Sequence, residues 1–462
     1  MMASRHRPGE RAAADRLSGR LARSAAVRTG QAGSLDAFHR WFAGQGERSY
    51  TETETVPLEE LDRWSRGPGT DGLAHDSGRF FRVRGIDVQA PDAVVPHWRQ
   101  PIIDQPETGI LGILVTEFDG VPHFLMQAKA EPGNLNGLQL SPTVQATRSN
   151  YLGVHGGRSV PYMEYFRDAA RRTVVADVRQ SEQGAWFYRK RNRNMIVEVH
   201  EAVEVLDGFR WLTLGQIHAL LRQNDLVNMD SRSVLACLPP ARSAPLRGED
   251  GVAQTDAELL SWITEMRSGT DVRVQVVPLD EVTGWHATDG RLRHESGLFF
   301  DVVGVRVRAR GREVAAWSQP MIAARTQGVI AFLVRRTGGT PQVLVQARAQ
   351  PGYVDGVELA PTVQCVPENY GLLPSAARPP FLDDVLRADA RRVLFDTVLS
   401  EEGGRFHHTR NRHVVVEVDE EWSGQHPGFR WVAVDQLAGL LRHSYYLNVE
   451  ARSLVTCLRS VI

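Results

Sequence analysis

Apolar residues recur at helical spacing in two short stretches of the chain, residues 35–45 and residues 259–269. Each stretch gathers its large apolar side chains on one side, which is typical of an amphipathic helix at the surface of a domain. Beyond each stretch the pattern changes to runs that suit strands. The chain therefore predicts a short helix followed by a sheet, twice.

Two pairs of apolar runs have the pattern of β-hairpins. In the first pair, residues 109–120 and 121–131 meet at Asp119 and Gly120. The second pair, within residues 328–350, has two glycines at the same place. Asp-Gly and Gly-Gly tolerate the positive φ values that a tight hairpin turn needs, so we expect a hairpin in each half.

Further elements follow each hairpin in the same order. A polar loop comes first, and residues 162–181 and 381–400 come next; they lack Gly and Pro and are expected to form a long helix. A strand-like run follows, and a last amphipathic helix closes each half. These later segments are residues 185–201 and 404–420 for the strands, and residues 214–223 and 434–443 for the helices.

The recurring order reflects an internal duplication. The segment of residues 115–145, which ends in SPTVQ, returns without a gap as residues 334–364, which end in APTVQ. The Asn-Tyr pair after each loop and the Arg-Asn-Arg run before each strand return at the same separation. A repeat of roughly two hundred residues is too long for a solenoid unit and suits a whole domain.

The segment PPARSAPLRGEDGVAQTD between the two copies has the Pro, Gly and charge content of a linker, with the boundary between Arg247 and Thr255. The element order resembles that of a Nudix-like α/β/α sandwich, which is an α+β fold. We therefore expect a mobile or helical N-terminal tail over residues 1–34, a first Nudix-like domain over residues 35–246 and a second over residues 256–462.

Charge and cysteine content narrow the classes of function. Lys and Arg number 54 and Asp and Glu number 55, so the net charge of -1 gives no global attraction to nucleic acid or acidic membranes. The three cysteines form no CxxC pair, which argues against a disulfide framework and a cysteine zinc site. No apolar run approaches membrane-spanning length. A cytoplasmic protein is expected.

Three long segments carry a resemblance to a known family. WRQPIIDQPETGILGILV, QAKAEPGNLNGLQLSPTVQATRSNY and GGRSVPYMEYF resemble the NDP-hexose 2,3-dehydratases of deoxysugar and antibiotic biosynthesis, and both halves share the resemblance from about Leu35 to the end. The resemblance implies a cytoplasmic homodimer with two Nudix-like domains per subunit. Each domain would have a pocket able to hold thymidine diphosphate.

The reaction implied by the resemblance removes water across C2 and C3 of dTDP-4-keto-6-deoxy-D-glucose. The C4 ketone acidifies the C3 proton, so a base removes that proton to give an enolate, and the C2 hydroxyl leaves. The 3,4-diketo-2,6-dideoxy product would pass to an NADPH-dependent 3-ketoreductase. The resemblance implies no cofactor and no metal, and the chain has no GxGxxG dinucleotide fingerprint of its own.

The polar loop of residues 131–151 concentrates amides and hydroxyls, which suit sugar and thymine edges. A polar surface loop is the simpler interpretation, but much of the loop returns in the second copy. We expect substrate binding by Gln127, Asn136, Gln139, Ser141, Thr143, Gln145, Thr147, Arg148 and Asn150, and by Glu358, Thr362, Gln364 and Tyr370 in the second copy.

The densest cationic run, RKRNR at residues 189–193, stands at the start of a predicted strand. Arg191 and Arg193 are two apart, so on a strand they face the same side. Guanidinium groups bind a diphosphate through forked hydrogen bonds, whereas a solvated charged face is the ordinary alternative. Arg410 and Arg412 are the equivalent residues of the second copy.

The general base is expected near the binding loop. Glu131 and Tyr151 are the candidates, followed by Glu198 and His155. In the second copy Gln replaces Glu131, whereas a carboxylate, Glu358, stands where the first copy has Gln. The more polar loop favours the first copy as the active one. His407, His408 and His413 lack an acidic partner motif, so no metal site is expected.

Three other functions stay open at this point. A metal-dependent Nudix-type pyrophosphohydrolase needs a helix of Glu residues to hold divalent metal, but the predicted helices present Arg and Ala there. Glu182, Glu401 and Glu402, past the ends of these helices, are expected to be solvated. A non-catalytic dTDP-sugar-binding scaffold is the second alternative. A helix-rich interaction protein is the third, and the hairpins argue against it.

Overall fold

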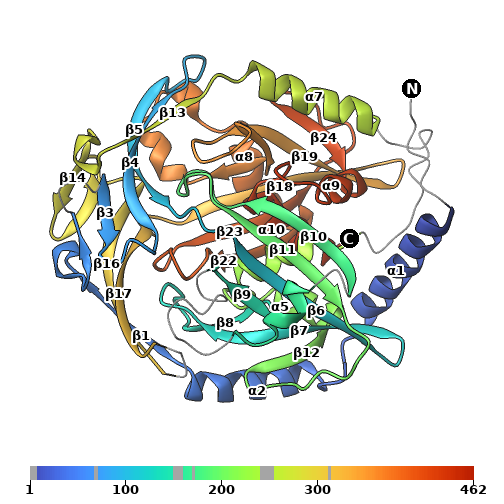
Figure 1. The fold of residues 1–462 in the computed structure, drawn as a ribbon. Coiled ribbons are helices and arrows are strands. Elements are labelled where there is room, and N and C mark those ends of the chain that lie inside the picture. Colours follow the sequence, from blue (N-terminus) through green and yellow to red (C-terminus); the bar gives the residue numbers. More distant parts are fainter. Residues whose placement is uncertain (1–7, 67–70, 149–159, 169–171, 240–253, 311–313) are drawn as a thin grey trace.

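The apolar runs around Asp119 and Gly120 form a hairpin of strands β6 (Gly109–Phe118) and β7 (Val121–Ala130). The structure, a computed structural model, describes residues 8–66, 71–148, 160–168, 172–239, 254–310 and 314–462 (Figure 1). At the turn, φ is 51° for Asp119 and 76° for Gly120, as a tight hairpin requires. The second hairpin turns at two glycines with positive φ, so both predicted hairpins are confirmed.

Each repeat builds a seven-stranded mixed sheet around its hairpin. The first sheet has the order β10-β11-β6-β7-β12, with β8 beside β7 and β9 beside β6, and β11 runs parallel to β6. The second sheet has the equivalent order β22-β23-β18-β19-β24, with β20 beside β19 and β21 beside β18. The other strands are β8 (Leu138–Ser141), β9 (Val144–Ala146), β10 (Thr173–Ser181), β11 (Arg191–Glu198), β12 (Phe209–Thr213), β18 (Gly328–Thr337), β19 (Thr340–Ala349), β20 (Val357–Ala360), β21 (Val363–Cys365), β22 (Val393–Ser400), β23 (Arg410–Glu417) and β24 (Phe429–Ala433).

Alternation along β6 explains why helices cover both faces of the sheet. Leu111 and Ile113 lie in the core with the helices that end the repeat, whereas Ile110 and Leu114 pack with Phe166 on the opposite face. This is the predicted α/β/α sandwich. The helices of the described residues are α1 (Pro8–Ala26), α2 (Leu35–Arg48), α4 (Met163–Arg167), α5 (Leu214–Leu220), α6 (Met229–Ala236), α7 (Asp256–Gly269), α8 (Leu382–Leu386), α9 (Val434–Leu440) and α10 (Val449–Arg459), with short 3-10 helices at Leu58–Glu60, Leu279–Glu281, Pro367–Gly371, Ser375–Ala377 and Ala390–Arg392.

The two repeats exchange their first strands. Strand β1 of the first repeat pairs antiparallel with β16 of the second, and β13 of the second pairs antiparallel with β4 of the first (Figure 1). Each five-stranded sheet is thus shared, and the predicted domain boundaries stay a prediction. One sheet comprises β1 (Thr51–Val56), β14 (Trp285–Thr288), β15 (Arg291–His294), β16 (Phe300–Ala309) and β17 (Ala316–Ala324), and the other β2 (Trp64–Ser65), β3 (Gly72–His75), β4 (Arg82–Gln89), β5 (His97–Asp104) and β13 (Arg273–Val277).

Two buried arginines join the repeats at the centre of the molecule, where α6 meets α10. Arg232 Nε donates to Ser453 Oγ at 2.6 Å, and Arg452 Nε donates to Ser233 Oγ at 2.9 Å. Each guanidinium also donates to the last carbonyl of the other repeat's strand, β22 or β10. Because both charges are buried and fully used, this contact fixes the repeats as one body.

The long helix predicted over residues 162–181 is wrong. Among the described residues of this range, Met163–Arg167 is helical and Thr173–Ser181 is strand β10; the second repeat likewise forms the short α8 and strand β22. Consecutive β-branched residues from Thr173 favour a strand, and the pairing of β10 with β11 overrides the helix propensity of the Ala-Arg run. The helix predicted to close each half is also followed by another, α6 or α10.

The solvated carboxylates predicted beyond these helices are also wrong in part. Glu182 and Glu401 are 5% and 4% exposed, because the strands that precede them run into the contact between the repeats. At the other end of the chain, the predicted tail contains helix α1, which packs on β7 and α5. In the described ranges no helix is long and apolar enough to cross a membrane.

Candidate functional site

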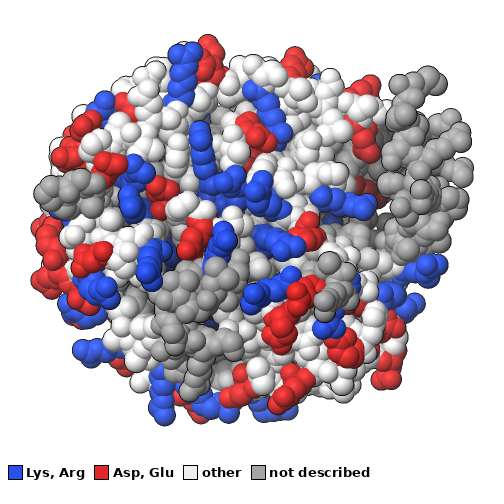
Figure 2. All heavy atoms as spheres, in the orientation of Figure 1, with Lys and Arg blue, Asp and Glu red and all other residues white. Residues whose placement is uncertain are grey.

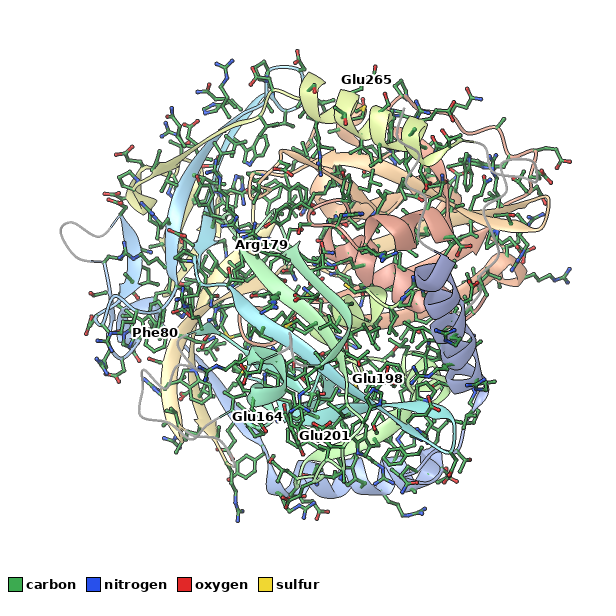
Figure 3. The ribbon with its side chains drawn as sticks, turned by 45° about the vertical axis from the view of Figure 1, so that its right-hand side comes forward. Phe80, Glu164, Arg179, Glu198, Glu201 and Glu265 are labelled. Atoms are coloured by element: carbon green, nitrogen blue, oxygen red, sulfur yellow. The ribbon has the colours of Figure 1, made fainter. Side chains whose placement is uncertain are left out.

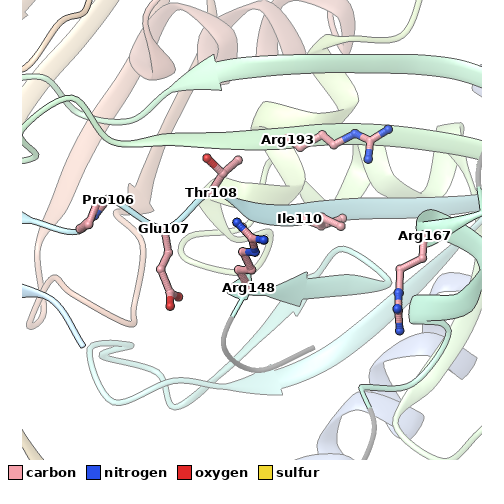
Figure 4. Close-up of a pocket in the computed structure, with 8 residues that line it drawn as sticks. Pro106, Glu107, Thr108, Ile110, Arg148, Arg167 and Arg193 are labelled. Atoms are coloured by element: carbon pink, nitrogen blue, oxygen red, sulfur yellow. The ribbon is translucent and has the colours of Figure 1, made fainter. Parts of the chain in front are cut away.

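A cavity of about 660 Å³ opens at the edge of the first seven-stranded sheet where β6 and β11 begin (Figure 4). Because β6 and β7 are antiparallel and β11 is parallel to β6, the end of β7 lies at the same edge. This topology brings the predicted binding loop and the cationic run together. The cavity is lined by Pro106, Glu107, Thr108, Gly109, Ile110, Arg148, Arg167 and Arg193.

Three arginines from three different elements surround the cavity. Arg148 follows β9, Arg167 ends α4, and Arg193 lies on β11 (Figure 4). Asp177 holds the Arg193 side chain through two hydrogen bonds of 2.7 and 2.5 Å. Lys and Arg side chains also gather across the middle of the face seen in Figure 2. Three guanidinium groups around one cavity suit a multiply charged anion such as a diphosphate.

A chain of hydrogen bonds leads from the cavity wall to a buried carboxylate. Gly109 N–H donates to Asn192 Oδ1 at 2.9 Å, and Asn192 Nδ2 donates to Glu182 Oε1 at 2.7 Å. Lys190 is buried beside Glu182 and donates to the carbonyl of Glu107 on the cavity wall. Burial lowers the pKa of Lys190 to about 8 and raises the pKa of Glu182, the latter against the charges of an arginine and of Lys190.

Glu182 belongs to a cluster of four carboxylates, Glu131, Glu182, Asp230 and Glu402, called the first-repeat cluster below. Burial raises the pKa of Asp230 well above its usual range, and the charges of the other three carboxylates reinforce the shift. Burial likewise raises the pKa of Glu402 to about 7, followed by the charge of Glu131. Like charges at one site cannot all ionise, so the cluster holds protonated and ionised carboxyl groups side by side.

Glu131, the predicted base, is 5% exposed at the end of β7. Its Oε1 accepts a hydrogen bond of 3.0 Å from Gln145 and lies 3.3 Å from the Lys129 ammonium. Its Oε2 is buried and hydrogen-bonds to no described residue. An unsatisfied buried carboxylate oxygen is costly in a folded protein and is typical of a group that meets a ligand or a proton.

The predicted binding loop forms a buried network that holds Gln145 in place. Ser141 Oγ donates to Gln145 Oε1 at 2.8 Å, and Asn228 Nδ2 donates to Ser141 Oγ at 3.2 Å. The Thr143 hydroxyl donates to the carbonyl of Leu125 and accepts from a backbone N–H of β6, so it ties the hairpin strands together. This network fixes Gln145, whose amide donates to Glu131, and so positions the Glu131 carboxylate.

Two other predicted binding residues of the first repeat form hydrogen bonds within the protein. Asn136 is exposed and donates to the Asp225 carbonyl at 2.9 Å, and buried Gln139 accepts from Ser400 of the second repeat at 2.9 Å. Gln127 lies within β7, Thr147 is half-buried after β9, and Arg191 begins β11. Asn150, Tyr151 and His155 lie outside the described residues.

The predicted residues of the second repeat are largely taken up by internal contacts. Glu358 is buried and accepts from Ser181 of the first repeat at 2.5 Å; burial raises its pKa to about 7. Tyr370 is half-buried, and burial raises its pKa as well. Thr362 bonds to backbone as Thr143 does, Gln364 accepts from Asn448 at 2.8 Å, Arg410 pairs with Asp225 at 2.5 Å, and Arg412 binds Asp396 twice.

Glu198, the second-choice base, lies away from the cavity. It ends β11 and is ion-paired with Arg20 of α1. Figure 3 shows Glu198 and Glu201 at the opposite end of the β10 and β11 pair from Arg179. Glu198 is therefore held in an ion pair at the end of β11, whereas the cavity lies where β11 begins.

Sequence reasoning missed Glu182, Asp230, Glu402 and Arg167 as site residues. A signal was available for two of them, because the second repeat keeps an acid at both equivalent positions, Glu401 and Glu450. Among the residues that the structure describes, no three His, Cys, Asp or Glu side chains gather closely enough to hold a metal ion. The site's chemistry is that of guanidinium, ammonium and carboxyl groups.

Comparisons with known proteins agree with this geometry. A model of the NDP-hexose 2,3-dehydratase family matches residues 35–238 and again residues 256–458. The dTDP-4-dehydro-6-deoxy-alpha-D-glucopyranose 2,3-dehydratase of Saccharopolyspora spinosa is 49% identical over 443 residues, which cover 92% of this chain and 91% of the relative. Proteins of the same name from Amycolatopsis orientalis and Streptomyces violaceoruber are 48% and 46% identical, cover 96% and 92% of this chain, and are themselves covered to 93% and 97%.

A solved Nudix hydrolase from M. smegmatis, RenU, is 21% identical, with a TM-score of 0.18 over 29% of this chain and 84% of the hydrolase. The family match is the stronger finding, because it spans both repeats and the relatives align over nearly their whole length. The dehydratase expected from the resemblance, a hydro-lyase, is confirmed. The chain belongs to the NDP-hexose 2,3-dehydratase family.

Proposed function

We propose that the protein removes water across C2 and C3 of dTDP-4-keto-6-deoxy-D-glucose, and that this happens in the first repeat. The observation that carries the proposal is the meeting of two features at one sheet edge: the cavity with three arginines and the first-repeat cluster directly behind its wall. A nucleotide sugar has an anionic half and a half that needs acid–base chemistry, so the two features match its two ends.

The arginines are proposed to bind the diphosphate and so to direct the sugar toward the carboxylates. Arg148 and Arg167 are exposed at the cavity, and Arg193 is oriented by Asp177. Charge-assisted hydrogen bonds to phosphate are about twice as strong as neutral ones, so this end of the substrate supplies most of the binding energy. Gln145, Ser141 and the rest of the buried network hold the reacting end in register.

The carboxylates are proposed to move the protons. Glu131, with its free Oε2, takes the C3 proton that the C4 ketone acidifies, and an enolate forms. The C2 hydroxyl leaves as water after it takes a proton from a neighbouring protonated carboxyl group, Asp230 or Glu182. The enol then tautomerises to the 3,4-diketo-2,6-dideoxy sugar. Tyr151 stays a second candidate for the base.

The product's reactivity and the resemblance support further proposals. A 3,4-diketo sugar nucleotide is unstable, so we expect a separate NADPH-dependent 3-ketoreductase to consume it, in the biosynthesis of an antibiotic deoxysugar. We also propose that the protein acts in the cytoplasm as a homodimer. The chain contains no CxxC pair, which fits a reducing compartment.

The test is turnover of dTDP-4-keto-6-deoxy-D-glucose by chelator-treated protein, with and without a 3-ketoreductase and NADPH. We expect the substrate to disappear without metal and the coupled reaction to give a 2-deoxy sugar nucleotide. Turnover that depends on added Mg²⁺ or Mn²⁺ and releases a sugar phosphate would instead indicate a Nudix-type pyrophosphohydrolase. Binding without turnover in either condition would indicate a scaffold.

A further inference from the structure

A loop of the second repeat, residues 401–406, enters the first repeat's site. Gly133 N–H donates to Gly403 O at 2.7 Å, and His408 N–H donates to Gly133 O at 2.9 Å. Gly403 has no Cβ, and one added there would overlap the side chains of Asn134 and Glu131. The backbone of this loop therefore packs directly on Glu131, the proposed base, and on Asn134.

Glu402 of this loop faces charged groups of the first repeat. Its Oε1 accepts from Gly404 N–H at 2.8 Å. Three residues on, Arg405 donates to Gln105 Oε1 at 3.3 Å and stacks on Phe81 at 4.1 Å, which anchors the loop beside the cavity wall. The charged and titratable groups that influence Glu402 or share its cluster are Glu131 after β7, Glu182 after β10, Lys190 before β11, Asp230 on α6 and Arg405 on its own loop.

The equivalent contact in the other direction has lost its charge. Gln183 of the first repeat takes the place of Glu402 and donates to Glu401 Oε2 at 2.6 Å. A glutamine amide can donate to its neighbouring carboxylate, whereas an ionised Glu402 can only repel Glu182. The same crossover thus brings a neutral amide, Gln183, to the second repeat and a carboxyl group, Glu402, to the first.

We propose that the catalytic centre is composite, and that Glu402, supplied by the second repeat, is a positioning residue that keeps a proton on a neighbouring carboxyl group of the first-repeat cluster. This inference rests on the proposed function and deepens it. With Glu402 present, one carboxyl group of the cluster retains the proton that the leaving C2 hydroxyl takes, while Glu131 is free to accept the C3 proton. One proton enters the cluster at Glu131 and one leaves it from the neighbouring acid in each turnover, so the number of protons is unchanged, and transfer of the proton from Glu131 to that acid restores the starting state.

Burial, followed by the charge of Glu131, raises the pKa of Glu402 to about 7, so above that pH Glu402 is ionised and its charge favours the protonated form of the neighbouring carboxyl groups. The test compares Glu402→Gln with Glu450→Gln, a buried carboxyl group on α10 of the second repeat that takes no part in the proposed chemistry. For E402Q we expect kcat to fall about 10- to 100-fold, with KM within about twofold, because the diphosphate contacts are intact. The acid limb of the kcat/KM profile should also move to lower pH, because the remaining carboxyl groups ionise without the charge of Glu402.

We expect E450Q to keep kcat within about threefold and an unshifted pH profile. Equal losses in the two variants, or an E402Q profile that stays unshifted, would overturn the proposal. A melting temperature for each variant separates loss of folding from loss of chemistry. If the wild-type protein itself does not turn over the sugar nucleotide, the proposed function fails. The interaction between Glu402 and the first-repeat cluster can then still be tested by measuring the stability of variants.

That second test is a double-variant cycle of Glu131→Gln and Glu402→Gln, read as melting temperature at pH 8. Each single substitution relieves repulsion between buried carboxylates, so we expect the shift of the double variant to be smaller than the sum of the single shifts. Additive shifts would mean that the two carboxyl groups do not interact, and the proposal would be wrong whatever the enzyme's substrate.

Discussion

Arg148 and Arg167 stand at the cavity of the first repeat, whereas the equivalent positions of the second repeat hold Pro367 and Leu386. Arg193 and its equivalent on β23 keep the same two-pronged contact with an aspartate of the neighbouring strand. The strand pairing that orients a cation has therefore been retained in both repeats, but two of the three guanidinium groups that would meet a diphosphate are present in the first repeat alone.

The buried clusters differ in the same direction. Gln350 replaces Glu131 and Thr409 replaces Lys190, whereas the acids equivalent to Glu182 and Asp230 are kept. The shared acids follow β10 or lie on α6, next to the buried arginines that join the repeats, whereas the positions of Glu131 and Lys190 hold uncharged residues in the second repeat. Residues that pack the two repeats together are therefore similar in both copies, whereas the residues proposed for binding and catalysis differ. This difference supports one active site per chain.

The largest effect is expected for Glu131→Gln, which gives the first repeat the residue that the second repeat has at the equivalent position, Gln350. We expect kcat to fall about 10²- to 10⁴-fold, because a general base contributes about that much to rate. The measurement is steady-state turnover of the sugar nucleotide. Gln350→Asn is the control in the second repeat and should leave kcat unchanged; a comparable loss there would show that both repeats contribute.

Because the two crossover contacts are equivalent, Gly133→Ala and Gly352→Ala should destabilise the folded protein by similar amounts. A Cβ on Gly133 would overlap the carbonyl oxygen of Phe406, and one on Gly352 would overlap that of Phe187. We expect each variant to lose about 1–3 kcal/mol of unfolding free energy in urea, as overpacking does. If only one variant is destabilised, the crossover contacts are not equivalent.

Arg167→Leu copies the second repeat's Leu386 into the cavity. Loss of one charge-assisted phosphate contact should raise KM about tenfold and leave kcat nearly unchanged, because the contact is made before and during the reaction alike. Arg172→Leu, which removes a surface partner of Glu201 outside the cavity, is the matched control. A fall in kcat with unchanged KM would contradict the assignment of Arg167 to the diphosphate.

The smallest expected effect concerns Glu450, the second repeat's equivalent of Asp230. Burial raises its pKa from 4.5 to about 8, so the folded protein binds this proton more tightly than the unfolded chain does. Stability should therefore decrease as pH rises from about 4.5 to about 8. Glu450→Gln should lose less melting temperature across this range than the wild type, by about 1–2 °C. Exposed Glu265→Gln should follow the wild type.

Local patterns in the sequence predicted the fold well where they were sufficient. The hairpin at Asp119 and Gly120 and the helices at residues 35–45 and 259–269 depend on turn chemistry and helical spacing, and all are present. Strand β10 was mistaken for a helix because its partner, β11, decides its state, and the exchange of β1 and β13 left no signal in composition.

The candidate site was predicted in part for the same reason. Gln145 and Arg193 are kept in both repeats, so the duplication singled them out, whereas Glu131 was expected as a carboxylate beside the binding loop. Glu182 looked like a solvated helix end because its burial depends on residues of the other repeat, more than two hundred positions away in sequence, roughly the length of a domain. Contacts between residues so far apart in sequence cannot be predicted from hydrophobic spacing. Glu402 was not predicted for the same reason, because its neighbours belong to the other repeat.

Because of the exchanged strands, each repeat completes a five-stranded sheet of the other. A single repeat made alone would leave the edge of its five-stranded sheet without β1 or β13 and would have to find that strand in another polypeptide. Two identical single-repeat chains can satisfy this need only as an interlocked pair with two identical pockets. Joining them end to end keeps the interlock at a high effective concentration and lets one pocket drift while the other stays under selection for turnover.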